Sequence, residues 1–157
     1  MLRISKLTDY ATVILAQLAA AGGDRRTAAA VAEDAGLAAP TVAKVLKELQ
    51  RAGLVTSSRG ARGGYTLGRD AHRITAADII DAVEGPVALT ECASHDNHCG
   101  IGKSCRVSGS WQRVSLAIRQ ALAEVTLAQL TGEAPVGVSA LKLAPGAETP
   151  LVWRARA

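Results

Sequence analysis

The chain has 157 residues, of which 48% are apolar and only 3% aromatic, and its formal charge is +4 at pH 7. This length supports one ordinary domain, and a core of Ala, Val, Leu and Ile suits packed helices. Charges in the N-terminal MLRISKLTDYA argue against a signal peptide, and no apolar stretch approaches a membrane span, so we expect a cytosolic chain with no membrane partner.

Three helices are predicted in the first third of the chain. Apolar residues recur at three- and four-residue intervals over residues 4–21, which is typical of a helix. Thr27 is placed to cap a short helix, AAAVAEDA, that Gly36 stops. A third helix accepts Pro40 in its first turn and ends at Gly53. Its expected buried stripe consists of Val42, Val45, Leu46 and Leu49.

The hydrophobic period then changes. LVTSS and GYTL are short β-capable segments joined by the glycine-rich SRGARGG, so residues 54–68 are predicted to form a hairpin. Thr75 followed by Asp78 resembles a capping box that opens a fourth helix through Val83. Gly85 and the proline after it end that helix.

One long helix is predicted over residues 110–130. It is apolar over more than one narrow face, which favours two neighbours, its own domain and a second copy of itself. The pattern therefore predicts a homodimer, with burial in the monomer core as the alternative. The main stripe is Trp111, Val114, Ile118, Ala121, Leu122 and Val125, and Leu116, Leu127 and Leu130 lie to one side of it. Residues 132–157 show no period and are predicted to be a flexible tail.

Three short helices followed by a hairpin are typical of a mainly α, winged helix-turn-helix fold, in which the third helix enters the DNA major groove. Residues 36–69 contain six Lys or Arg and one acid, Glu48, a local charge of +5. The glycines of the turn leave arginines free to reach a narrowed minor groove. The candidate DNA contacts are Thr41, Lys44, Lys47 and Arg51 on the third helix and Arg59 and Arg62 on the wing.

The predicted organisation is a DNA-binding domain at 1–84, a cysteine-bearing loop at 85–109, a dimerisation helix at 110–131 and the tail.

All three cysteines lie in ECASHDNHCGIGKSC, at Cys92, Cys99 and Cys105. An odd number of thiols in a reducing compartment argues against a disulfide framework and favours a metal or redox site. Iron–sulfur ligation, zinc with one histidine, and a thiol switch with positive neighbours Lys103 and Arg106 all fit the residue types. No nucleophile–base set indicates an enzyme, and the acids Asp78, Asp81 and Glu84 are explained as a cap and a solvated face.

LTDYA, RGARGGYTL, ITAADIIDAVEG and the following three-cysteine loop resemble the IscR/NsrR-type family of bacterial winged-helix transcription regulators. ALTEC and SWQRVSLAIRQALAEVTLAQL look most like its branch of SUF iron–sulfur assembly regulators. The resemblance covers about residues 1–131. It implies a homodimer on a palindromic double-stranded operator, with one iron–sulfur cluster (2Fe-2S or 4Fe-4S) per subunit ligated by Cys92, Cys99 and Cys105. It implies a repressor of iron–sulfur assembly genes that senses cluster, redox or nitrogen-oxide status.

The fourth cluster ligand stays open. Six residues separate the first two cysteines, and Val107 stands where the assembly-regulator branch has a histidine ligand. Asp9 ranks first, because its TD dipeptide resembles the nitric-oxide-sensing branch, in which an N-terminal aspartate of the partner subunit ligates. His98 ranks second and His95 third. The alternatives to a cluster are a cluster-free thiol-redox repressor and a zinc-stabilised adaptor that does not bind DNA.

Overall fold

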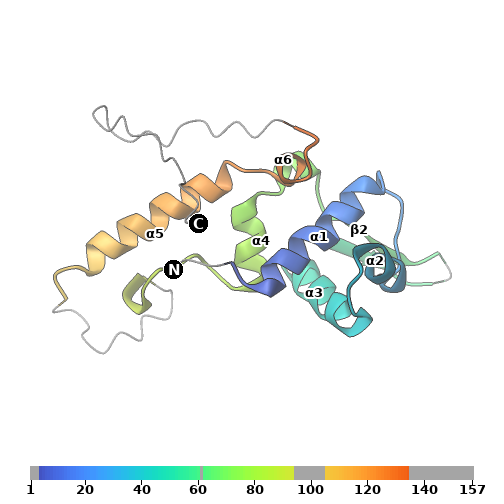
Figure 1. The fold of residues 1–157 in the computed structure, drawn as a ribbon, viewed down its shortest axis with the longest axis horizontal. Helices are drawn as coiled ribbons and strands as arrows, with labels where there is room; N and C mark the ends of the chain where they lie inside the picture. Colours follow the sequence, from blue (N-terminus) through green and yellow to red (C-terminus); the bar gives the residue numbers. More distant parts are fainter. Residues whose placement is uncertain (1–3, 61, 94–104, 135–157) are drawn as a thin grey trace, which may run out of the picture.

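The computed structural model describes residues 4–60, 62–93 and 105–134. Its elements are α1 (Lys6–Ala20), α2 (Ala28–Ala35), α3 (Ala39–Arg51), β1 (Val55–Ser58), β2 (Gly64–Leu67), η1 (Ala71–Arg73), α4 (Ala76–Val83), η2 (Glu91–Ala93), α5 (Ser108–Ala123) and α6 (Leu127–Leu130). In Figure 1, α1 to α4, α6 and the strands gather at one end, and α5 projects from them. The predicted mainly helical, winged helix-turn-helix fold is confirmed. None of the helices in the described ranges is long and apolar enough to cross a membrane.

The core lies between α1, α3, α4 and the first residues of α6. The apolar stripe predicted for α3 is confirmed, since all four of its members are fully buried. They pack against the buried face of α1. The helix predicted over residues 4–21 is wrong at its N-terminal end, because Ile4 precedes α1 and is 62% exposed. The buried apolar residues of the two helices are Ala11, Ile14, Leu15, Leu18, Val42, Val45, Leu46 and Leu49.

Side-chain caps start two helices where the sequence predicts them. The Thr27 hydroxyl accepts a hydrogen bond from the Ala30 amide at 3.1 Å. Thr75 and Asp78 form the complete capping box, with bonds of 2.9 and 3.1 Å between each side chain and the other residue's amide. These bonds satisfy amides that have no partner within the helix, so the two N-termini are set by local chemistry.

The predicted hairpin is confirmed as an antiparallel pair with Val55 opposite Leu67 and Ser58 opposite Gly64. The turn between α1 and α2 pairs with the wing through a single β-bridge, in which Arg26 and Tyr65 exchange backbone hydrogen bonds of 3.0 and 2.8 Å. The wing is therefore fastened to the body of the domain through its second strand.

The single helix predicted over residues 110–130 is wrong: α5 ends at Ala123 and α6 begins at Leu127. Thr126 caps α6 through a capping box with Gln129 and forms a β-bridge with Thr75. The Leu127 amide donates to the Ile74 carbonyl at 2.7 Å. These contacts turn the chain into the core, where Leu127 and Ala128 are 0% exposed. Leu127 is thus a core residue and is not part of the outward apolar surface predicted for one continuous helix.

Two carboxylates, Asp81 on α4 and Glu84 at its C-cap, hold neighbouring elements. Glu84 is exposed as predicted, whereas Asp81 is half-buried, so the prediction of a solvated face is wrong for Asp81. Asp81 accepts a 2.5 Å hydrogen bond from Arg119 and so ties α4 to α5. Glu84 accepts hydrogen bonds from the Thr8 hydroxyl and, at 3.2 Å, from the Ser5 amide, which ties the end of α4 to the start of α1. The Thr8 bond lowers the pKa of Glu84 below its ordinary value of 4.5; burial acts in the opposite direction, and the bonds from Ser5 lower the pKa further.

Removing the charge of Glu84 should weaken the fold in a pH-dependent way. Because its folded-state pKa is lowered, the stabilisation is complete above about pH 4.5 and disappears as pH falls through the folded-state value. Glu84→Gln should therefore unfold at lower denaturant than the parent at pH 7, and the gap should close well below pH 4.5. Denaturant titrations at both pH values measure this difference in stability. Glu33→Gln, at an exposed position of α2, is the charge-matched control. A gap that is constant with pH would contradict the role of the carboxylate.

Candidate nucleic-acid interface and cysteine-bearing segment

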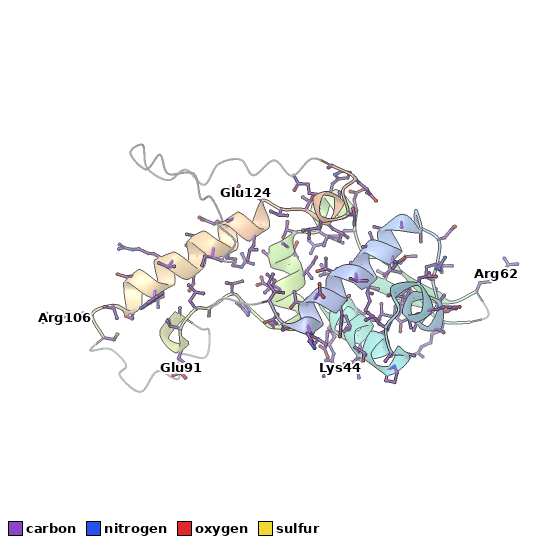
Figure 2. All side chains as sticks on the ribbon, in the orientation of Figure 1. Lys44, Arg62, Glu91, Arg106 and Glu124 are labelled. Carbon is purple, nitrogen blue, oxygen red and sulfur yellow. The ribbon has the colours of Figure 1, made fainter. Side chains whose placement is uncertain are left out.

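The outward face of α3 carries two free lysines. Lys44 and Lys47 are exposed on the side of the helix opposite its buried stripe, and Thr41 on the same helix is half-buried. In the described part of the chain, no carboxylate lies within ion-pair distance of either lysine. Figure 2 shows Lys44 on this helix at the edge of the molecule. Both ammonium groups are therefore available to an anionic partner.

Arg51 differs from the other predicted contacts. Its Nη1 donates to both carboxylate oxygens of Glu48, at 2.9 and 2.8 Å. This exposed ion pair is worth less than about 1 kcal/mol, so a phosphate can displace it. Arg51 would nevertheless have to give up Glu48 before binding another anion, whereas Lys44 and Lys47 have no such partner among the described residues.

The wing presents its arginines at the far end of the domain from α5. Arg59 and Arg62 are exposed, and Figure 2 shows Arg62 reaching outward from the turn. The turn is narrow because the Gly63 amide donates to the Gly60 carbonyl at 2.8 Å. A Cβ on Gly63 would stand 2.5 Å from the Ser58 carbonyl oxygen. The glycine thus allows the close backbone turn that carries the two arginines.

Two arginines that were not among the predicted DNA contacts, Arg25 and Arg26, lie beside the wing. A polar groove between the α1–α2 turn and the wing is lined by Asp24, Arg25, Arg26, Arg62, Gly63 and Thr66. Arg26 is paired with Asp34, whereas Arg25 is exposed. Charge counting over residues 36–69 leaves these arginines out. Two consecutive arginines just before the N-cap of α2 are visible in the sequence as a local positive charge. Their position beside the wing, however, depends on the β-bridge between Arg26 and Tyr65.

Two cysteine-bearing segments meet at α5. Cys92 lies in η2, which packs against α5, and Cys105 precedes the outer end of that helix, half-buried, with its carbonyl accepting a 3.2 Å bond from the Ser108 hydroxyl. In Figure 2, their neighbours Glu91 and Arg106 both lie at the end of the molecule opposite Arg62. Cys99, His95 and His98 are outside the described residues. Among those described, no three His, Cys, Asp or Glu groups are gathered as a metal site.

Asp9, the predicted fourth ligand, lies exposed in the first turn of α1. It lines a groove with apolar residues that include Ile4, Leu122 and Leu130. Asp9 lies on α1, which packs on α4, whereas Cys105 lies just before the first residue of α5.

In the described ranges α5 contacts α4 and η2, but most of its residues are exposed. Ser115, 4% exposed, is its one buried residue among those described, and its hydroxyl accepts a bond from the Leu89 amide at 3.2 Å. Trp111, the first member of the predicted apolar stripe, is 41% exposed. Val114, one turn further on, is 42% exposed, so these two residues form an outward apolar surface. Leu116, 56% exposed, lies on the opposite flank of the helix.

A basic third helix beside a two-stranded wing defines a winged helix-turn-helix protein. A model of the Rrf2 family, described as "Iron-dependent Transcriptional regulator", matches residues 4–133. The chain belongs to the Rrf2 family of transcriptional regulators.

Known relatives agree with this assignment. Over 100 residues the chain is 35% identical to the HTH-type transcriptional regulator IscR of Xenorhabdus nematophila, a match to 64% of this chain and 60% of that protein. The solved structure of CymR (YrzC), the global cysteine regulator of B. subtilis, is similar at 30% identity and a TM-score of 0.65, covering 85% of this chain and 99% of that one. T. potens IscR is similar at 30% identity and a TM-score of 0.61, covering 84% and 88%.

Proposed function

We propose that this protein is a DNA-binding repressor whose α3 enters the major groove and whose wing contacts the adjacent minor groove. One observation carries the proposal: both α3 and the wing tip of a winged helix-turn-helix fold carry exposed cations that have no carboxylate partner among the described residues. Lys44 and Lys47 serve phosphates or guanine edges, Arg59 and Arg62 suit the negative potential of a narrow minor groove, and Thr41 and Arg51 complete the set.

The exposed apolar surface of α5 supports a homodimer. A contiguous apolar face rimmed by polar residues marks an interaction site, and two copies of one helix are self-complementary about a two-fold axis. A dimer of this kind places two α3 helices on a palindromic operator, which doubles the number of phosphate contacts. The proposed interface is built on Trp111 and Val114, which lie one turn apart, and Leu116 is exposed on the opposite flank of α5.

We further propose that Cys92, Cys99 and Cys105 hold one iron–sulfur cluster per subunit, either 2Fe-2S or 4Fe-4S. The donor set fits such a group, because thiolates are its preferred ligands and two of the three cysteines lie on segments that meet at α5. When bound, the cluster supplies sensitivity to oxidants and nitrogen oxides. Asp9 of the partner subunit is the proposed fourth ligand, with His98 as its alternative. The relatives named IscR support control of iron–sulfur assembly genes.

A thiol switch without metal is the second candidate. Cys105 is partly exposed, so its thiol can be reached by an oxidant from solution. The similarity to a global cysteine regulator favours this reading as well. The two candidates share one fold and one DNA interface, so only the chemistry at sulfur separates them.

Protein purified without air tests both candidates. We expect visible absorption, with iron and sulfide bound in matched amounts, and an operator affinity that differs severalfold between the loaded protein and the same protein after chelation. Replacing Cys92, Cys99 and Cys105 by serine should abolish the colour and the difference in affinity, because a serine hydroxyl is a poor ligand for iron–sulfur iron. Colourless protein whose DNA affinity responds to a thiol oxidant would favour the switch. Equal affinity in every form would overturn both.

A further inference from the structure

The turn between α1 and α2 is held against the wing at close range. Its Arg26 exchanges two backbone hydrogen bonds with Tyr65 on β2. Gly64, beside that residue, has a φ of +155°, and a Cβ there would lie 2.9 Å from the Arg26 carbonyl oxygen and 3.3 Å from the Arg25 Cβ. A larger residue would push the turn away. The glycine therefore keeps Arg25 at a fixed short distance from the arginine-bearing turn of the wing.

The groove between these two segments carries charges of both signs. Arg25 and Arg62 are exposed, and no carboxylate lies within ion-pair distance of either in the described ranges. Arg26 is paired with Asp34. Asp24, which lines the same groove, is exposed and opposes them. The available cations are thus Arg25 on the body side and Arg62 on the wing side.

We propose that this groove receives the sugar–phosphate backbone bordering the minor groove, with Arg25 as a phosphate contact on the side of the wing away from α3. The inference rests on the proposed function, because it takes Arg62 to be at the minor groove. A side chain in a narrow DNA minor groove is flanked by a phosphate strand. A cation that lines the same protein groove as Arg62 faces that phosphate strand. The Thr66 hydroxyl, which also lines the groove, shares a 2.9 Å hydrogen bond with the Thr56 hydroxyl.

Arg25 and Asp24 then have opposite effects on DNA affinity. Arg25 attracts the phosphate strand, while the neighbouring carboxylate repels it and limits how tightly a non-operator duplex is held. A purely structural role for the turn would not produce two effects of opposite sign, since either substitution would then weaken the fold or do nothing. The sign of the change thus identifies the groove as a DNA contact.

The test measures operator affinity of the dimer at several salt concentrations. Arg25→Gln should bind about three- to tenfold more weakly at low salt, and the slope of log affinity against log salt should fall by about 0.9 for each lost phosphate contact. Arg113→Gln on exposed α5 removes the same charge far from the wing and should leave the slope unchanged. An Arg25→Gln slope equal to that of the parent overturns the proposal.

Asp24→Asn provides the opposite arm. It should tighten binding severalfold at low salt and do so for operator and unrelated duplexes alike, because backbone contacts carry no base information. Glu124→Gln, an equal charge change at the end of α5, is its control. Equal or weaker binding by Asp24→Asn also overturns the proposal. Lys44→Gln distinguishes failure of the groove assignment from failure of the proposed function. If Lys44→Gln weakens DNA binding and Arg25→Gln does not, only the groove assignment is wrong. If neither substitution weakens DNA binding, the proposed DNA interface itself is wrong.

Discussion

Leu127→Ala should lower the free energy of unfolding by about 2–5 kcal/mol, the range for truncating a fully buried leucine that leaves a cavity. Leu127 is 0% exposed at the first position of α6, where its amide is bonded to the Ile74 carbonyl. The backbone bonds on both sides hold α6 in place, so the core has little freedom to collapse into the space. Denaturant unfolding at one fixed protein concentration measures the change, since a dimer makes stability depend on concentration.

Leu130 supplies the matched control in the same helix. It is 45% exposed, so Leu130→Ala should cost less than half as much as the change at Leu127. If the sequence periodicity were right and one continuous helix carried both residues on an outer face, the two substitutions would have similar, small effects on the fold. Equal effects would therefore contradict the turn of the chain into the core at Thr126.

Gly63→Ala should impair DNA binding about tenfold or more, equivalent to ~1.4 kcal/mol, while leaving the core intact. The new Cβ would meet the Ser58 and Gly60 carbonyl oxygens at 2.5 and 2.8 Å, distances that side chains do not tolerate. Both obstacles are backbone atoms, so the turn itself must open. Opening it moves Arg59 and Arg62 away from their positions at the wing tip. Operator binding at low salt, measured beside thermal unfolding, separates the two effects.

Gly109→Ala is the control for this substitution. Nothing in the described structure lies within 4 Å of a Cβ at Gly109, and an alanine within a helix is more stable than glycine by up to about 1 kcal/mol. It should therefore leave DNA binding unchanged and the fold as stable as before or more so. Wild-type affinity in Gly63→Ala would show that the wing arginines do not require this turn geometry.

Elements defined by local chemistry were predictable from the sequence. The start of α2 at Thr27 and of α4 at Thr75 follow from hydroxyls that accept hydrogen bonds from amides within the next turn. The buried stripe of α3 follows from its 3.6-residue period, and the hairpin follows from its glycine-rich turn. In each case the stabilising contacts join residues that are close in sequence.

Contacts between residues far apart in sequence were not predictable. The end of α5 depends on the bridge between Thr126 and Thr75, and the roles of Asp81 and Glu84 depend on Arg119 and Thr8. An apolar period continues across the break at residues 124–126, so periodicity alone reads one helix where there are two. Ile4 likewise continues the period of α1 without belonging to the helix.

The sequence by itself determined the order of the elements, the basic character of α3 and the wing, and the set of thiols available to a metal, because these follow from local pattern and residue type. Only the tertiary structure decided that Leu127 lies in the core, that Trp111 and Val114 on α5 are exposed among the described residues, and that Arg25 lies beside the wing. The physical reason is that burial and charge pairing depend on which distant segments meet. Those meetings are set by packing and backbone pairing that a linear pattern does not record.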